Sequence, residues 1–212
     1  MIRWLLDLIY PPRCVLCHAL LDSSRETICD KCGRLVLSQP TGIRHGRQFT
    51  RCVSPLTYDG VVRDSVHRFK FGGRKFYAKS YSLWMAAAVQ QEIEEFDVLT
   101  WVPVSRRRKR NRGYDQGFEL CRHMAELLER EEVSCLKKVR NNPKQSTLSN
   151  REGRKKNVKD AYIAVEPENF CGKRVLLVDD VITTGETLEE CSRVLQRAGA
   201  KEVLCATLAH TK

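Results

Sequence analysis

Residues 175–187 read Val-Leu-Leu-Val-Asp-Asp-Val-Ile-Thr-Thr-Gly-Glu-Thr. The apolar run 175–178 is typical of a strand that is buried on both faces, and the residues from Glu186 onwards have the spacing of a helix. A buried strand that leads directly into a helix is a building unit of parallel sheets with helices on both faces. This stretch therefore predicts a parallel α/β domain.

The same stretch combines two carboxylates with a loop that suits a phosphate. Asp179 and Asp180 follow the expected strand, at the carboxyl edge where open α/β sheets bind ligands. The hydroxyls of Thr183, Thr184 and Thr187 and the N–H groups of a helix N-terminus favour a phosphate, whereas carboxylates accept hydrogen bonds from vicinal hydroxyls. This polarity is that of a ribose 5-phosphate. Taken singly, such residues also serve as turn and cap residues.

Two other phosphate-handling folds disagree with the sequence. A nucleoside triphosphatase P-loop requires Gly-x-x-x-x-Gly-Lys-Ser/Thr, and the chain has no such motif. A phosphoacceptor receiver domain also has a strand that ends in two aspartates, but that strand comes first in the domain. Only 32 residues follow Asp180, which is too few for the rest of a receiver domain.

Strand-like and helix-like segments alternate along the chain, which extends the prediction of a parallel sheet. We expect strands at 52–58, 97–104, 135–139, 161–165, 174–178 and 202–208, and helices at 59–71, 76–96, 118–130 and 186–198. Asp115 stands where the N-cap of the helix at 118–130 is expected. Residues 38–51 contain Pro40, Gly42 and Gly46 and few apolar anchors, so we expect a linker there.

Four of the ten cysteines are organised in pairs. Cys14 and Cys17 form one Cys-x-x-Cys pair, and Cys29 and Cys32 form a second pair after an interval of eleven residues. Two such pairs supply the four thiolates that structural zinc prefers, and four protein ligands leave no open position for a catalytic water. We therefore expect one structural zinc; four free buried thiols in a reducing compartment are the alternative.

The composition indicates a soluble globular protein. A chain of 212 residues with 42% hydrophobic and 30% charged residues can form one well-packed domain with a small appendage. Residues 1–10 suit a short amphipathic helix better than a signal peptide, and no later stretch approaches the about 20 apolar residues of a membrane span. We expect a cytoplasmic protein in which residues 1–50 hold that helix, the cysteine module and the linker, and residues 51–212 hold the α/β domain.

The net charge of +11 is concentrated in two segments. Residues 105–112 carry six basic side chains and no acid, and residues 137–159 carry nine basic side chains and one acid, so the rest of the chain is slightly acidic. Such segments favour a pyrophosphate or a nucleic-acid backbone, although a solvated surface gives the same pattern. The first segment is expected near the aspartate pair, and the turn-rich second segment is expected to be a loop over the ligand.

Residues 175–187 resemble the phosphoribosyl pyrophosphate signature of type I phosphoribosyltransferases. Five further motifs, together with the cysteine module, resemble the ComF competence family. These motifs are Tyr58–Arg63, Phe69–Arg74, Val102–Ser105, Arg112–Gln116 and Gln145–Ser149. The resemblance extends over nearly the whole chain, and it implies an α/β, parallel-sheet, type I phosphoribosyltransferase-like domain that is preceded by a small four-cysteine zinc-binding module.

The resemblance also implies roles for the site residues. Asp179 and Asp180 would hold the ribose hydroxyls, and the 5-phosphate loop would consist of Thr183, Thr184, Gly185, Glu186 and Thr187. Val104, Ser105 and Arg106 fall where this fold binds pyrophosphate, and Mg²⁺ would bridge diphosphate and ribose oxygens. The residues expected to contact nucleic acid are Arg107, Arg108, Lys109, Arg110, Arg112, Lys155 and Lys156.

Three functions fit this combination. The first is a protein of natural competence that binds phosphoribosyl pyrophosphate and single-stranded DNA during DNA uptake, with a helicase-like partner implied by the resemblance. The second is an active phosphoribosyltransferase of nucleotide metabolism, and the third is a ligand-sensing regulatory module. No group that would orient a particular base is identifiable in the sequence, so the catalytic residues, the base acceptor, the oligomeric state and any DNA sequence preference stay open.

Overall fold

The computed structural model describes residues 11–23, 26–140 and 158–212. The helix expected at 1–10, the Gln145–Ser149 motif, and Lys155 and Lys156 lie outside the described residues.

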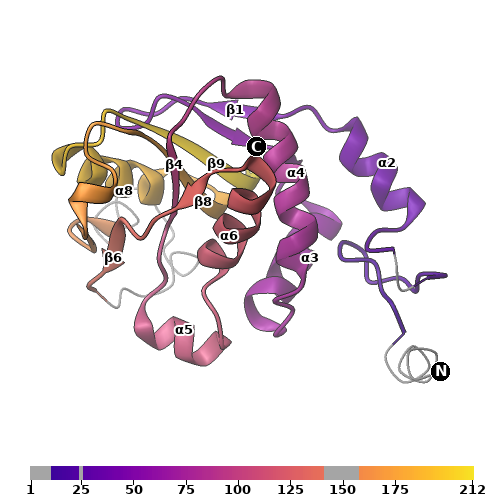
Figure 1. Ribbon diagram of the computed structural model, residues 1–212. Coiled ribbons are helices and arrows are strands. Elements are labelled where there is room, and N and C mark those ends of the chain that lie inside the picture. Colours follow the sequence, from indigo (N-terminus) through magenta and orange to yellow (C-terminus); the bar gives the residue numbers. More distant parts are fainter. Residues whose placement is uncertain (1–10, 24–25, 141–157) are drawn as a thin grey trace.

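A seven-stranded sheet forms the centre of the molecule (Figure 1). Its strands are β1 (Gly42–Arg44), β2 (Cys52–Ser54), β3 (Leu56–Thr57), β4 (Val98–Trp101), β5 (Glu131–Glu132), β8 (Arg174–Ile182) and β9 (Glu202–His210). The order is β1-β2-β9-β8-β4-β5, with β3 also beside β9, and every pair is parallel except β1–β2. The predicted parallel sheet is thereby confirmed.

Helices cover both faces of this sheet. On one face lie α3 (Gly60–Phe71), α4 (Tyr77–Glu92) and α6 (Gln116–Leu128), and on the other lies α8 (Glu186–Arg197) (Figure 1). Successive side chains of a strand point to opposite faces, so Leu176 and Val178 of β8 enter the core on the α4 and α6 face, whereas Val175 and Leu177 enter the core beneath α8. The apolar run of β8 is continuous because both of its faces are covered.

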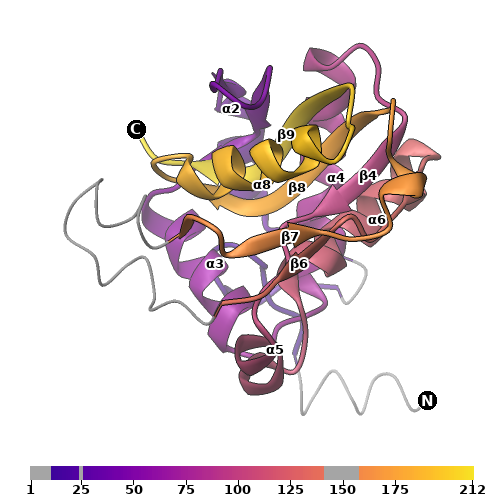
Figure 2. The same cartoon turned by 90° about the vertical axis from the view of Figure 1, so that its left-hand side faces the viewer.

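Two strands that the sequence predicts for the parallel sheet belong to another sheet. β6 (Leu136–Lys138) and β7 (Tyr162–Ala164) pair with each other, antiparallel, in a separate two-stranded sheet. Figure 2 shows them side by side next to α8. Strands that are consecutive in the chain can pair as the two arms of a hairpin, which requires no crossover helix. The parallel sheet therefore holds fewer of the predicted strands than expected.

Several other elements differ from the prediction in their bounds or were not predicted. β8 continues to Ile182 because it stays paired with β9 as far as His210, so the two aspartates lie inside the strand rather than after it. α4 ends at Glu92, and the next residue, Ile93, is extended. The basic run forms a short helix, α5 (Arg106–Arg112), and a 3-10 turn spans Pro167–Asn169.

The cysteine module packs against α3. It contains an isolated antiparallel β-bridge between Arg13 and Leu20, and helix α2 (Asp30–Ser38). Val15 and Leu16 are buried in the same core as α3 and α4, and their carbonyls accept hydrogen bonds from Ser65 and Arg68 of α3. β1, in the segment expected to be a linker, pairs with β2 and so forms an edge of the main sheet. Among the described helices, none is long and apolar enough to cross a membrane.

Candidate functional site

A cavity of about 470 Å³ opens where β4 and β8 end. The end of β8 and the loop into α8 line it with residues 179–188. The opposite sides come from the end of α3, the segment after β4, one face of α5 and the β6–β7 pair. Because the carboxyl ends of neighbouring parallel strands meet at one edge, these distant segments of the chain converge here.

Asp179 and Asp180 lie in this cavity near the end of β8. The backbone N–H of Asp180 donates to Asp179 Oδ1 over 2.8 Å, and Lys70 Nζ lies 2.7 Å from Asp180 Oδ1. Burial and the neighbouring Asp180 carboxylate raise the pKa of Asp179 to about 7. The pair thus combines a carboxyl group that contacts Lys70 with a second one, that of Asp179, that is readily protonated near neutral pH.

The loop after the aspartates leads into the N-terminus of α8. Gly185 is the N-cap of α8 and has a φ of +82°, a left-handed conformation that favours glycine. The first N–H groups of a helix have no acceptor within the helix, and they carry a partial positive charge. Residues 183–187 all line the cavity, so this loop offers donors to an anion there.

The basic helix α5 divides into two faces. Arg108 and Arg112, one turn apart, line the cavity, whereas Arg107, Lys109 and Arg110 are exposed and lie outside its lining. Arg112 donates to Gln116 Oε1 over 2.6 Å, and its guanidinium carbon lies 4.8 Å from the centre of the Phe71 ring. The residues considered for nucleic-acid contact are therefore not equivalent, since two of them face the cavity.

The three residues considered for pyrophosphate differ in position. Val104 lines the cavity, but its backbone N–H already donates to Asp115 Oδ2 over 3.0 Å. Ser105 is buried and is the N-cap of α5, accepting a hydrogen bond from the N–H of Arg108. Arg106 is exposed and is not part of the cavity lining.

Lys70, Lys138 and Tyr162 line the cavity and were not singled out from the sequence. Lys138 Nζ lies 2.8 Å from the Tyr162 hydroxyl and 4.7 Å from the centre of its ring, and burial lowers the pKa of Lys138 to about 8. Lys70 belongs to the Phe69–Arg74 motif, which was a signal for it. Lys138 belongs to the basic segment 137–159, which is expected near the ligand, but Tyr162 has no such signal, because the sequence does not predict the β6–β7 pairing that joins them.

The four paired cysteines form one cluster. The sulfur atoms of Cys14, Cys17, Cys29 and Cys32 all lie within 4.8 Å of one another, and those of Cys17 and Cys29 are 3.7 Å apart. Four thiolates around zinc at about 2.3 Å have sulfur atoms about 3.8 Å apart in a tetrahedron, so the cluster fits the ion. Cys52, by contrast, is buried in β2 and is not part of the cluster.

Asp179→Asn should stabilise the fold without ligand. The folded pKa of about 7 lies above the ordinary value of 3.8, so the folded chain holds an extra proton between these values and stability falls as pH rises through this range. An asparagine removes this penalty, which we expect to be on the order of 4 kcal/mol at pH 8 and less than half of that at pH 5. Urea unfolding at both pH values measures it, and a variant less stable than wild type at pH 8 would contradict the assignment.

The sequence matches two family models. Residues 115–212 match the phosphoribosyl transferase domain, and residues 5–59 match the double zinc ribbon domain. The match to the second model and the sulfur geometry together make the N-terminal segment a zinc-ribbon module with four cysteine ligands.

Relatives match over nearly the full length. Competence protein F of Haemophilus influenzae is 27% identical over 215 residues, covering 90% of this chain and 93% of the relative. The DNA utilization protein YhgH of Salmonella typhimurium is 30% identical over 229 residues, covering 95% of this chain and 100% of the relative. Competence protein ComFC of Streptococcus pneumoniae is 26% identical over 195 residues, covering 88% and 77%. The chain therefore belongs to the ComF family, whose members carry names such as competence protein and DNA utilization protein.

Proposed function

We propose that the cavity binds phosphoribosyl pyrophosphate with Mg²⁺, and that the exposed face of α5 binds single-stranded DNA. The observation that carries the first part is the charge pattern of the cavity. The carboxyl groups of Asp179 and Asp180 adjoin a helix N-terminus, and cationic side chains face the same space. The ligand has matching parts, namely a diol, a 5-phosphate and a diphosphate.

Each part of the ligand has its own set of groups. Asp179 and Asp180 accept hydrogen bonds from the ribose hydroxyls, and the loop 183–187 donates to the 5-phosphate. Lys70, Arg108 and Arg112 line the cavity and supply positive charge for the diphosphate. Mg²⁺ would neutralise diphosphate oxygens and keep several of its waters, since it prefers oxygen ligands in an octahedral arrangement.

A phosphoribosyl transfer to an acceptor is the second candidate function. Lys138 and Tyr162 favour it, because an ammonium and a hydroxyl in the cavity lining can orient an acceptor by hydrogen bonds. In such a transfer, the cations of the cavity would stabilise the charge of the departing pyrophosphate. Pyrophosphate release across a panel of bases tests this candidate, and it is rejected if none of them raises the rate above that without acceptor.

The exposed face of α5 supports the proposal of DNA binding. Arg106, Arg107, Lys109 and Arg110 are exposed on this one helix, and no acidic residue lies within it. Cations on one face attract the phosphate backbone of a nucleic acid and release its counterions. The names of the relatives, competence protein and DNA utilization protein, agree with this role. A cytoplasmic location and a helicase-like competence partner complete the proposal, both by resemblance to the family.

A charge-removal variant should weaken DNA binding. Arg107→Ser with Arg110→Ser should lower the affinity for a labelled oligo-dT by tenfold or more at 50 mM salt, because two phosphate contacts are lost. The slope of log affinity against log salt should become shallower by about 1.4. Fluorescence anisotropy between 50 and 300 mM salt measures both quantities.

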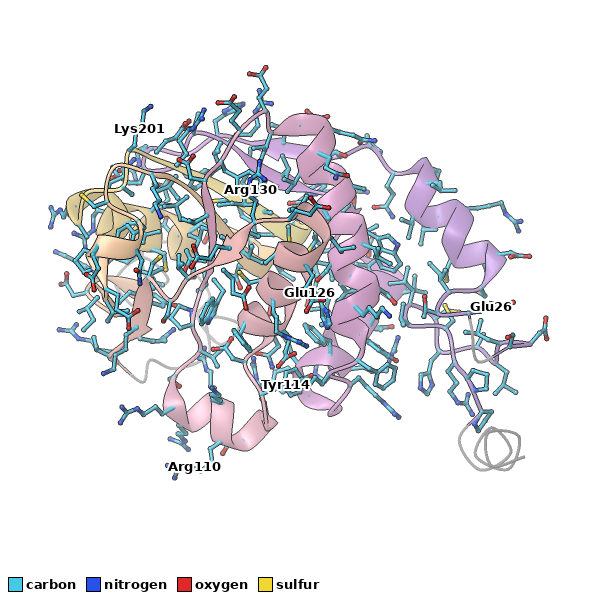
Figure 3. The ribbon with its side chains drawn as sticks, viewed as in Figure 1. Glu26, Arg110, Tyr114, Glu126, Arg130 and Lys201 are labelled. Carbon is cyan, nitrogen blue, oxygen red and sulfur yellow. The ribbon has the colours of Figure 1, made fainter. Side chains whose placement is uncertain are left out.

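The matched control removes the same charge at the opposite end of the molecule. Arg197 and Lys201 are exposed at the end of α8 and just before β9, and Figure 3 shows Lys201 far from Arg110. Arg197→Ser with Lys201→Ser should leave DNA affinity within about twofold of wild type, since these residues are distant from α5. Equal losses in both variants, or no binding by the wild type at 50 mM salt, would reject the DNA-binding face.

A further inference from the structure

The guanidinium group of Arg44 connects three distant parts of the chain. Arg44 is the last residue of the edge strand β1, and it donates through one nitrogen to the carbonyl of Thr183 over 2.6 Å. Through its other terminal nitrogen it donates to the carbonyl of Thr211. The N–H of Thr211 in turn donates to the carbonyl of Ile182 over 3.1 Å. Arg44 thus holds the start of the loop 183–187 from outside the cavity.

The position of β1 is also fixed by its close approach to the end of β9. Gly42 lies so close to the imidazole ring of His210 that a Cβ atom there would collide with it. Gly42 is also paired with Ser54 across the β1–β2 ladder. Arg44 therefore extends from a strand whose distance to the end of β9 is set by close contact.

The hydrogen bond from Arg44 to the Thr183 carbonyl also sets the direction of the next N–H group, that of Thr184. The described chain contains no cis peptide bond, and in a trans peptide the C=O and the following N–H point in opposite directions. Arg44 holds the Thr183 carbonyl and does not line the cavity, whereas Thr183 and Thr184 do. The N–H of Thr184 is consequently turned to the side of the loop away from Arg44, where the cavity lies.

We infer that Arg44 is a positioning residue that orients the Thr184 N–H for the phosphate of the bound ligand. This inference rests on the proposed function, because it assigns that loop a phosphate. A donor that is already oriented before binding gives a tighter complex than one that must be ordered by the ligand. Since β1 follows the cysteine cluster and α2 in the chain, Arg44 also connects this N-terminal part to the loop 183–187.

Calorimetric titration with ribose 5-phosphate tests the inference in four proteins. Arg44→Met should bind about tenfold more weakly than wild type, because the carbonyl of Thr183 loses its donor. Arg44→Lys should lie between the two, since an ammonium keeps the charge but replaces two fixed donors by a single flexible group. Arg51→Met is the matched control: the guanidinium of Arg51 also donates to a backbone carbonyl, that of Glu92, and it should bind within twofold of wild type.

A spectroscopic readout separates orientation from general stability. In protein labelled with ¹⁵N-threonine, the amide signal of Thr184 should move on saturation with ribose 5-phosphate, and it should move less in Arg44→Met at equal saturation. A purely structural role would lower the unfolding temperature without changing this shift. Wild-type affinity in Arg44→Met, full recovery in Arg44→Lys, or an equal loss in Arg51→Met would overturn the inference.

Inorganic phosphate distinguishes failure of the inference from failure of the proposed function. It needs only the loop, so the same four proteins can be titrated with it. In one outcome, the wild type binds phosphate but not ribose 5-phosphate, and phosphate binding is weakened in Arg44→Met. That result would support the role of Arg44 and reject the proposed ligand. A wild type that binds neither probe would overturn both.

Discussion

Asp179→Asn combined with Asp180→Asn should lower the affinity for phosphoribosyl pyrophosphate by about 100-fold or more. Each carboxylate is expected to accept a charge-assisted hydrogen bond from the ribose, which contributes about 1.5 to 3 kcal/mol. Two such losses sum to about 3 to 6 kcal/mol, which exceeds the about 2.8 kcal/mol that corresponds to a 100-fold change in affinity. Isothermal titration calorimetry in the presence of Mg²⁺ measures the effect.

The control for this variant removes two carboxylates elsewhere. Asp22 and Asp64 are exposed and do not line the cavity, so Asp22→Asn with Asp64→Asn should bind as wild type does. The double site variant should stay folded, because removing the buried carboxyl of Asp179 relieves an unfavourable burial. If the site variant folds and its affinity is unchanged, the two aspartates do not hold the ribose.

Removal of zinc should unfold the N-terminal module. Zinc binding to a structural thiolate site contributes an apparent 10 to 16 kcal/mol or so, far more than a small module gains from its own core. Val15 and Leu16 belong to this module and are buried in the core that it shares with α3. Unfolding of the module would therefore also expose part of that core. Hydrogen exchange of residues 14–38 with and without a strong chelator measures the unfolding, and exchange there should rise steeply.

Zinc content gives the stoichiometry. Protein purified without chelator should hold one zinc per chain, and Cys17→Ser should lose most of it. Cys171→Ser is the matched control, because Cys171 is an exposed cysteine outside the cluster, and it should keep its zinc. A wild type without zinc, or unchanged exchange after chelation, would contradict a metal-held module.

The elements that the sequence predicted well have strong local signals. The apolar run of β8 and the helical spacing of α8 identified the centre of the sheet, and Asp115 caps α6 as expected, accepting a hydrogen bond from the N–H of Phe118. In these segments burial and capping act on residues that are close in the chain. The cysteine cluster was predictable for the same reason, because its four residues form two Cys-x-x-Cys pairs that are close in the chain.

The elements that were missed depend on other information. α5 has no apolar periodicity, and its ends are set by the Ser105 N-cap and by Gly113, whose φ is +82°. The antiparallel pairing of β6 and β7, which joins Lys138 to Tyr162, is a contact across a long connection. The pairing of Lys70 with Asp180 likewise links two elements that meet only in the folded sheet. Hydrophobic periodicity and capping residues are local patterns, and they do not predict which distant segments pair.

The most direct test of the ligand cavity is a calorimetric titration of the wild-type chain with phosphoribosyl pyrophosphate and Mg²⁺, with ribose 5-phosphate as the reference ligand. A cavity with separate groups for the diol, the 5-phosphate and the diphosphate predicts one site per chain. It also predicts tighter binding of phosphoribosyl pyrophosphate than of ribose 5-phosphate, and weaker binding when Mg²⁺ is left out. Absence of saturable binding at millimolar ligand would contradict the account.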